Sequence, residues 1–213
     1  MGAREQILVA LDVDNLPSAL RLVEQLREDV GGFKIGLELC THVGVPQALE
    51  AISREGGKVF VDLKLKDIPN TVAGAARALR HPGVLMFNVH CDGGLAVMRA
   101  AATAGRSGEY RPLILGVTVL TSLDEPTLNT ELRVPGSLSE HVVQMARLAQ
   151  TADLDGVVCS AREVAVVKAA CGADFLVVVP GVRPTWAGSD DQRRVMTPGE
   201  TARAGADYLV IGR

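Results

Sequence analysis

Three charged residues stand close together in an otherwise apolar part of the chain. Asp62, Lys64 and Asp67 lie in the segment 61–71, where an apolar run gives way to a helical pattern. In a β-strand, residues two apart point to the same face, so Asp62 and Lys64 are expected to project together, with Asp67 following on the turn. An alternation of carboxylate, ammonium and carboxylate can hold a lysine protonated beside a reacting carbon. The segment therefore predicts a catalytic lysine between two carboxylates.

The same residues also have a purely structural interpretation. Asp62 and Lys64 can form a salt bridge at the end of a strand, and Asp67 can cap a helix whose first turn contains Pro69. Structural ion pairs bring charges together in the same way as active sites do. The segment alone leaves both interpretations open.

Composition restricts the class of protein. The chain has 213 residues, of which 47% are hydrophobic, and this is enough for one substantial core and a single domain over residues 1–213. A net charge of -3 and an aromatic content of 3% provide neither the basic surface nor the stacking rings typical of nucleic-acid binding. The sequence shows no apolar run of the length that a membrane span or a secretory signal requires. We therefore expect a cytoplasmic protein that binds neither nucleic acid nor a membrane.

Cysteine and histidine spacing gives no indication of a metal site. The four cysteines are far apart and form no C-x-x-C pair; they are Cys40, Cys91, Cys159 and Cys171. Without a secretion signal, reduced thiols are expected rather than disulfides or zinc ligands. The histidines show no H-x-x-E or H-x-H spacing, so no metal is expected.

Short apolar runs alternate with amphipathic stretches along the whole chain. The runs are continuous, as in parallel strands that are covered on both faces. They predict eight strands, at 7–13, 33–36, 58–64, 84–90, 113–118, 156–159, 175–179 and 208–211. The stretches between them predict seven helices, at 16–29, 45–55, 68–80, 95–104, 138–151, 161–169 and 197–204. Strict alternation favours a closed (β/α)8 TIM barrel over an open sheet, with the final helix missing from this sequence.

Polar residues gather where the predicted strands end. In chain order they are Asp12, Lys34, Asp62, Lys64, Asn88, His90, Thr118, Thr121, Ser122, Arg183 and Arg213, and the two arginines stand near Gly181 and Gly212. Active sites of such barrels lie at this end, and the loops after strands seven and eight commonly hold a phosphate. Singly, each has a structural explanation: a helix cap for Asp12, a snorkelling chain for Lys34 and a solvated loop charge for Arg183. Together they predict a site for a phosphorylated substrate.

A long polar segment follows the seventh predicted strand. Residues 180–196 include Gly181, Pro184 and Gly188, together with a run of charged residues. A loop of this length beside a phosphate site is typical of a mobile lid over an active site.

The sequence resembles the orotidine 5'-monophosphate decarboxylase family over residues 7–213. The family's D-x-K-x-x-D-I-P-N-T element stands here as Asp62-Leu-Lys64-Leu-Lys-Asp67-Ile-Pro-Asn-Thr71, and its A-L-D start as Ala10-Leu-Asp12. Further elements match in order: Phe33-Lys34-Ile-Gly, Val119-Leu-Thr121-Ser122, Pro180-Gly-Val-Arg183, Asp191-Gln192 and Ile211-Gly212-Arg213. The resemblance implies a TIM barrel that converts orotidine 5'-monophosphate to uridine 5'-monophosphate in de novo pyrimidine biosynthesis.

The resemblance also implies a role for each matching residue. Lys64, Asp62 and Asp67 would be catalytic. Asp12 and Lys34 would contact the ribose. The pyrimidine would contact Thr121, Ser122 and Gln192. The phosphate would contact Gln192, Arg183, Gly212 and Arg213. Asp67 and Thr71 would reach into the neighbouring subunit's site in a homodimer.

The implied reaction suits the residues. Loss of carbon dioxide from carbon 6 of the pyrimidine leaves a carbanion orthogonal to the π system of the ring, which neither an imine nor a metal delocalises. Lys64 can stabilise this charge and then donate the proton, while Asp62 and Asp67 keep the lysine charged. No cofactor is therefore expected.

Two other functions remain open. 3-Keto-gulonate 6-phosphate decarboxylase and hexulose-phosphate synthase resemble this chain in the D-x-K-x-x-D element, but they use magnesium and an additional acidic ligand at the rim. A binder of nucleotide phosphate without catalytic activity would need Arg183 and Arg213 but not Lys64. Lys34 and Gln192 favour a ribose and a pyrimidine over a sugar phosphate.

Overall fold

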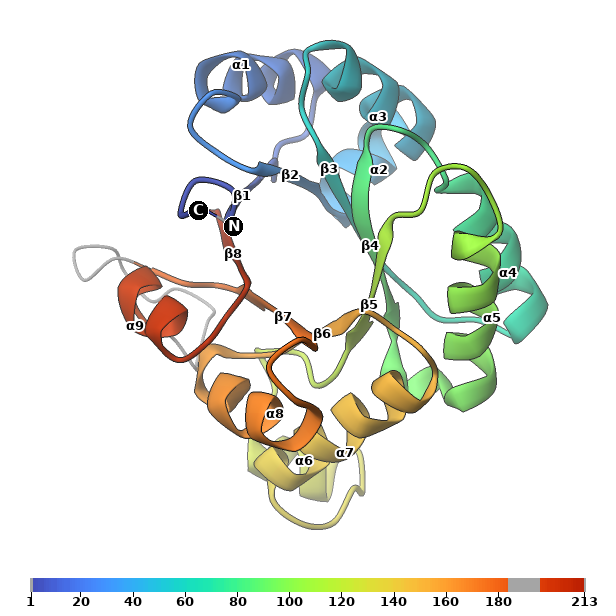
Figure 1. Cartoon of the computed structure of the whole chain (residues 1–213), viewed down its shortest axis with the longest axis vertical. Helices are drawn as coiled ribbons and strands as arrows, with labels where there is room; N and C mark the ends of the chain where they lie inside the picture. Colours follow the sequence, from blue (N-terminus) through green and yellow to red (C-terminus); the bar gives the residue numbers. More distant parts are fainter. Residues whose placement is uncertain (1, 184–195, 213) are drawn as a thin grey trace.

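Eight parallel strands close into a barrel that the helices surround (Figure 1). The computed structural model describes residues 2–183 and 196–212. The strands are β1 (Ile7–Ala10), β2 (Gly32–Ile35), β3 (Val59–Leu65), β4 (Val84–His90), β5 (Leu113–Val117), β6 (Gly156–Val158), β7 (Leu176–Pro180) and β8 (Tyr208–Ile211). Each strand pairs in parallel with the next, and β8 pairs with β1. The predicted TIM barrel is confirmed.

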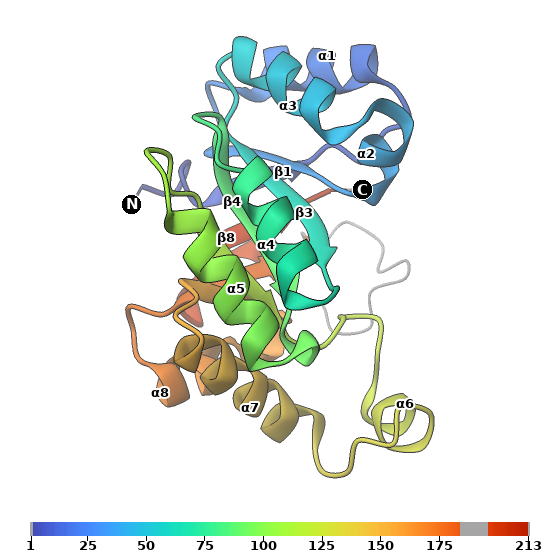
Figure 2. The ribbon, with the colours of Figure 1, turned by 90° about the vertical axis from the view of Figure 1, so that its right-hand side faces the viewer.

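The helices lie outside this sheet. They are α1 (Leu16–Leu26), α2 (Leu37–Val43), α3 (Val45–Arg54), α4 (Pro69–Ala78), α5 (Leu95–Arg106), α6 (Glu125–Thr130), α7 (Leu138–Thr151), α8 (Val164–Cys171) and α9 (Pro198–Arg203), with the short 3-10 helices η1 (Cys91–Gly93) and η2 (Ala161–Glu163). Figure 2 shows α4 and α5 side by side across β3 and β4. Within the described part of the chain, no helix has the length and apolar character needed to cross a membrane.

Each of the seven predicted helices is present, although η2 precedes α8 in the segment predicted as one helix. The sequence prediction missed α2 and α6. These helices have only seven and six residues, so the helical period of 3.6 residues does not stand out in their sequences.

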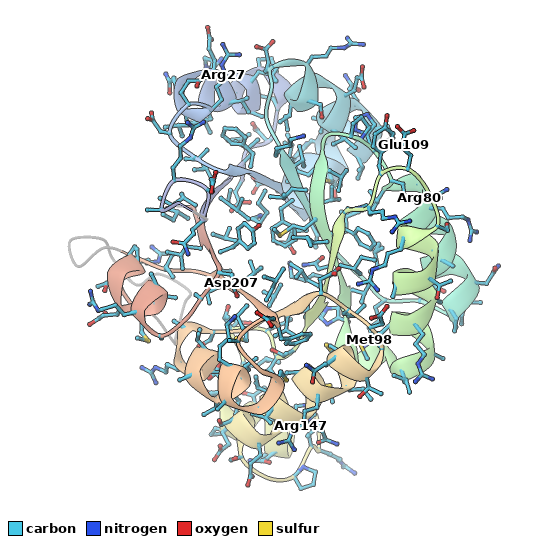
Figure 3. All side chains as sticks on the ribbon, in the orientation of Figure 1. Arg27, Arg80, Met98, Glu109, Arg147 and Asp207 are labelled. Atoms are coloured by element: carbon cyan, nitrogen blue, oxygen red, sulfur yellow. The ribbon has the colours of Figure 1, made fainter. Side chains whose placement is uncertain are left out.

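Side chains divide between two cores. The residues inside the barrel include Leu8, Phe60, Met86, Leu115, Val178 and Val210. A larger core lies between the strands and the helices, and Met98 of α5 is fully buried there, whereas Arg27, Glu109 and Arg147 lie at the periphery (Figure 3). The strands therefore pack against apolar side chains on both faces, which explains why the apolar runs are continuous.

β3 shows how the two cores separate charged from apolar side chains. Leu63 and Leu65 pack against the outer core, on the helix side of the sheet. Asp62 and Lys64 instead line a cavity within the barrel. The prediction that Asp62 and Lys64 project together is confirmed. The fold thus places both charges in one site.

Candidate active site

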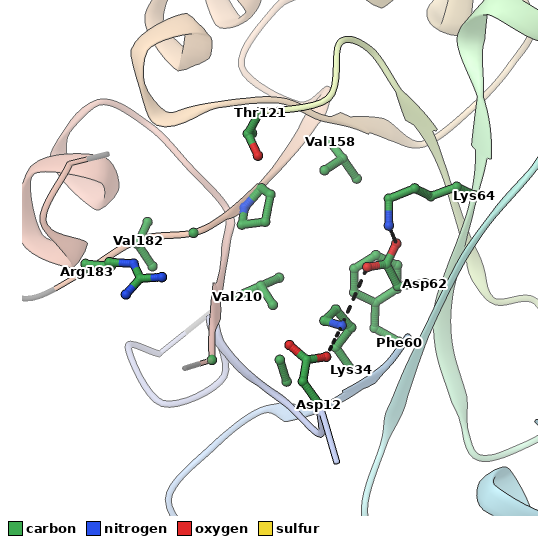
Figure 4. A pocket seen from close by; sticks show the side chains of 14 residues that line it. Asp12, Lys34, Phe60, Asp62, Lys64, Thr121, Val158, Val182, Arg183 and Val210 are labelled. Carbon is green, nitrogen blue, oxygen red and sulfur yellow. Dashed lines mark hydrogen bonds and ion pairs between the residues drawn. The ribbon is translucent and has the colours of Figure 1, made fainter. Parts of the chain in front are cut away.

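A cavity of about 230 Å³ lies among the ends of the strands (Figure 4). Its charged lining residues are Asp12, Lys34, Asp62, Lys64 and Arg183. Its remaining lining is largely apolar and comprises Ala10, Phe60, Thr121, Val158, Pro180, Gly181, Val182, Val210 and Gly212. The cavity therefore has charged groups from the first three strands on one side and Arg183 across from them.

Four charged side chains form a continuous array along one side of this cavity. Lys34 Nζ lies 3.0 Å from Asp12 Oδ1 and 3.7 Å from Asp62 Oδ2. Lys64 Nζ lies 2.8 Å from Asp62 Oδ1. Signs alternate along the order Asp12, Lys34, Asp62 and Lys64, so each charge has a neighbour of opposite sign. Lys34 is only 8% exposed, so the interpretation of Lys34 as a snorkelling surface residue is wrong.

Asp62 is the shared member of this array. Burial by itself would raise the pKa of Asp62, but the charges of Lys64 and Lys34, together with hydrogen bonds from Lys64 and Asn88, outweigh the burial. The pKa of Asp62 is therefore held below its ordinary value of 3.8. At neutral pH, Lys64 thus has a charged carboxylate as its partner.

The backbone at Lys64 departs from regular strand geometry. Its φ is 53°, in the left-handed region, which costs a residue other than glycine about 1 to 3 kcal/mol. Asn88 of β4 binds this segment: its Oδ1 accepts a hydrogen bond from the Lys64 backbone N–H at 2.7 Å, and its Nδ2 donates to Asp62 Oδ1 at 2.7 Å. Sequence reasoning placed Asn88 at the rim but gave it no role, although a polar residue inside the apolar run 84–90 was a usable signal.

Other predicted substrate-binding residues are only partly gathered here. Thr121, Arg183 and Gly212 line the cavity. Ser122 is exposed, and it is not among the residues that line the cavity. Gln192, Arg213 and most of the predicted lid lie outside the described residues.

Asp67 and Thr71 lie on the surface of this chain rather than beside Lys64. Both are exposed, at the turn after β3 and in the first turn of α4. The Asp67 carboxylate accepts a hydrogen bond from the Ile68 backbone N–H at 2.6 Å. Within one subunit, therefore, only Asp62 of the two predicted carboxylates contacts Lys64.

Helix capping does not explain the acidic residues of the site. Asn15, not Asp12, is the N-cap of α1, and its side chain accepts from the Ser18 backbone N–H at 2.9 Å. Ile68 occupies the N-cap position of α4, so the alternative in which Asp67 caps this helix is also wrong. Pro69 does occupy the first turn, as expected.

The described side chains form no metal-binding cluster. Over residues 2–183 and 196–212, no cluster of three or more His, Cys, Asp or Glu side chains is arranged to hold a metal ion. The expectation that the reaction needs neither metal nor cofactor stays a prediction.

Known proteins resemble this chain over nearly its whole length. The model of the orotidine 5'-phosphate decarboxylase / HUMPS family matches residues 5–213. The chain belongs to this family.

Individual members of the orotidine 5'-phosphate decarboxylase / HUMPS family resemble this chain closely. The orotidine 5'-phosphate decarboxylase of Moorella thermoacetica is 50% identical over 218 residues, covering 100% of this chain and 86% of the relative. That of Syntrophotalea carbinolica is 51% identical over 216 residues, covering 99% and 88%. The crystal structure of the enzyme from Lactobacillus acidophilus superposes with a TM-score of 0.83 at 34% identity, covering 97% of this chain and 89% of that one. The resemblance seen in the sequence is thereby confirmed.

The depressed pKa of Asp62 predicts a pH-dependent contribution to stability. A carboxyl group whose pKa is lower in the folded than in the unfolded chain stabilises the fold above the unfolded value, and this contribution is lost as pH falls through the folded pKa. We expect Asp62→Asn to lower the free energy of unfolding near neutral pH, and the deficit to shrink at pH below about 3.8. Urea unfolding at a series of pH values measures this difference.

Asp174→Asn is the matched control, because Asp174 is an exposed carboxylate in a turn. Its effect on unfolding should stay small at each pH. A deficit for Asp62→Asn that stays constant into the acid range would contradict the lowered pKa.

Proposed function

We propose that this chain decarboxylates orotidine 5'-monophosphate to uridine 5'-monophosphate, the step that forms uridine 5'-monophosphate in de novo pyrimidine biosynthesis, without metal or cofactor. The family and the relatives named above support the reaction. The observation that carries it is the Lys64 ammonium, which is held 2.8 Å from the partly buried carboxylate of Asp62 inside a cavity at the strand ends. A cation in that place matches the anion that decarboxylation creates.

Lys64 supplies both the charge and the proton. As carbon dioxide leaves, negative charge develops on carbon 6 of the pyrimidine, and the Lys64 ammonium stabilises it electrostatically. Lys64 Nζ then donates its proton to the same carbon. Asp62 orients the Lys64 ammonium, and Lys34 fixes Asp62 from the other side. The array is thus in place before the substrate binds, which lowers the cost of reorganisation in the transition state.

The remaining lining suits a phosphorylated nucleoside. Asp12 and Lys34 offer an acceptor and a donor for ribose hydroxyls, and Thr121 offers a hydroxyl to the pyrimidine. Arg183 and Gly212 belong to the loops after β7 and β8, where barrels commonly bind phosphate. Ser122, Gln192 and Arg213 complete the proposed substrate contacts on the resemblance alone.

We also propose a homodimer whose two sites are shared, with Asp67 and Thr71 reaching the partner's site. Ile68, between them, is 67% exposed, and Leu37 at the start of α2 is 60% exposed. These two large apolar side chains follow adjacent strands at the same end of the barrel. A second subunit would bury them and bring Asp67 toward a lysine that it does not contact within its own chain.

A reducing compartment, the cytoplasm, is our proposal for the location of the protein. Its four cysteines are free thiols. Burial raises the pKa of Cys91 to about 12, so this thiol stays protonated. Free, protonated thiols suit a compartment that keeps cysteine reduced.

Replacement of Lys64 tests the proposed reaction. Lys64→Ala removes the proton donor and the adjacent charge, and loss of a general acid alone lowers turnover by about 100- to 10,000-fold. Binding of uridine 5'-monophosphate should remain, because the groups around ribose and phosphate are unchanged. Loss of orotidine 5'-monophosphate absorbance measures turnover, and titration calorimetry measures binding of the product.

The control variant for this replacement is Lys66→Ala. Lys66 lies two residues away, but it is exposed and pairs with Asp92 at 2.7 Å instead of lining the cavity. Its turnover should stay near that of the wild type. A decrease of less than about tenfold for Lys64→Ala would refute Lys64 as the proton donor.

Mixed dimers test the shared sites. Lys64→Ala and Asp67→Asn subunits are each expected to be nearly inactive alone. In a heterodimer with shared sites, one site collects both changes, whereas the other keeps an intact Lys64 and an intact Asp67. After random exchange, half of the dimers are mixed and each has one good site of two, so about a quarter of wild-type activity should return.

A mixture of Lys64→Ala with Lys64→Gln subunits provides the control, because neither subunit can supply the missing lysine. It should stay inactive at the same degree of exchange. If the first mixture also stays inactive once mixed dimers are shown to form, then Asp67 serves its own subunit and the shared arrangement is wrong.

A further inference from the structure

The pairing of β3, the strand that carries Lys64, with β4 contains a register shift. Val61 pairs with Phe87 and Leu65 pairs with Val89, so β3 advances by four residues where β4 advances by two. Such a bulge removes backbone groups from the regular ladder and redirects the side chains within it. Lys64 lies in this bulge with a left-handed φ, and its backbone N–H binds a side chain of β4 instead of a backbone carbonyl.

The side chain that binds the bulge is the amide of Asn88. Asn88 is 1% exposed and is not among the described residues that line the cavity. Its orientation follows from its partners: the Lys64 N–H can only donate, and the charged Asp62 carboxylate can only accept. The amide oxygen therefore faces Lys64, and the amide nitrogen faces Asp62.

These contacts close a ring around Lys64. Asn88 Oδ1 holds the backbone of Lys64, and Asn88 Nδ2 holds Asp62 Oδ1, the same oxygen that accepts from Lys64 Nζ at 2.8 Å. One buried amide therefore holds both the backbone of Lys64 and the carboxylate that binds the Lys64 side chain. Without the amide, the bulge would lose its hydrogen-bond partner, and Lys64 would be free to return toward the extended backbone that residues other than glycine prefer.

We propose that Asn88 is a positioning residue for the reaction proposed above: its buried amide fixes the backbone of Lys64 and the carboxylate of Asp62 in the arrangement that directs the ammonium at the reacting carbon. The inference rests on the proposed function, since it assigns Asn88 to the same site. It differs from a role in stability alone, because it requires that loss of the amide slow the chemical step while leaving substrate binding largely intact.

Asn88→Leu removes both hydrogen bonds at nearly constant volume. Misplacement of a catalytic group by about 1 Å can cost about 100-fold in rate, so kcat should fall by about that factor. KM, and the Kd for uridine 5'-monophosphate, should stay within about threefold of wild type, because the cavity lining is unchanged. The rate is measured by loss of substrate absorbance.

Thr118→Val is the matched control. Thr118 is also buried at a strand end, where its hydroxyl donates to the Val158 carbonyl at 2.9 Å. It is not among the described residues that line the cavity, and no described hydrogen bond joins it to Lys64 or Asp62. This variant loses a buried hydrogen bond directly after the neighbouring strand β5. Its kcat should stay within about threefold of wild type.

Asn88→Asp separates positioning from stability. The new carboxyl keeps an acceptor for the Lys64 N–H but repels Asp62 when ionised. When protonated, it can donate to Asp62 Oδ1 as the amide does. The ratio of kcat for this variant to kcat for wild type should therefore rise as the pH is lowered, an effect that a general loss of stability would not produce.

The outcomes are distinct. A folded Asn88→Leu with kcat within about threefold of wild type, or with a loss confined to KM, would overturn the inference while leaving the proposed function intact. A ratio of Asn88→Asp kcat to wild-type kcat that does not change with pH would also overturn the inference. This second test still applies if Asn88→Leu does not fold. Failure of both variants to fold would assign Asn88 to stability alone and overturn the inference. A wild-type protein that does not convert orotidine 5'-monophosphate would refute the proposed function first, and the inference with it.

Discussion

A carboxylate held between two ammonium groups is the interaction on which this site depends. Asp62 lies 2.8 Å from Lys64 and 3.7 Å from Lys34, and Lys34 in turn lies 3.0 Å from Asp12. Removal of one member of such a partly buried array leaves a neighbouring charge without its partner, which is unfavourable. The array therefore joins the ends of the first three strands electrostatically. It also places an ammonium group of the chain itself in the cavity.

The barrel makes this array possible because it brings distant residues to one end of a closed sheet. Apolar residues such as Phe60 and Val210 line the same cavity, and charges interact more strongly beside such surfaces than they do in water. The bulge of β3 adds a local feature that the regular barrel does not provide. It places Lys64 in a left-handed conformation that a buried amide of β4 supports.

The fold was largely predictable because burial of both strand faces leaves a direct mark on the sequence. Continuous apolar runs identified the eight strands, and the closed order of the strands agrees with their alternation with helices. Asp62 and Lys64 were expected to share a side on the assumption of a regular strand. They do line one cavity, but the strand is bulged between Val61 and Leu65. Residue types alone do not show a register shift between two strands.

The parts of the site that the sequence left open depend on geometry beyond the local pattern. The contact between Asn88 and Asp62 joins residues 26 positions apart, and it exists only in the observed register. Thr121 lines the cavity whereas the adjacent Ser122 is exposed, a difference set by the path of a loop. The role proposed for Asp67 requires a second chain, so no pattern within one chain decides it.

The central claim is that an ammonium group of the chain, rather than a metal, carries the reaction. The most direct measurement is the conversion of orotidine 5'-monophosphate by the wild-type protein in D2O after exhaustive treatment with a chelator. The account predicts that the chelator-treated protein is as fast as the untreated protein in D2O, and that the uridine 5'-monophosphate formed carries one deuterium at carbon 6. Lack of conversion, or conversion that stops on chelation and returns with magnesium, would contradict the account and favour the metal-dependent sugar-phosphate enzymes of the same barrel type.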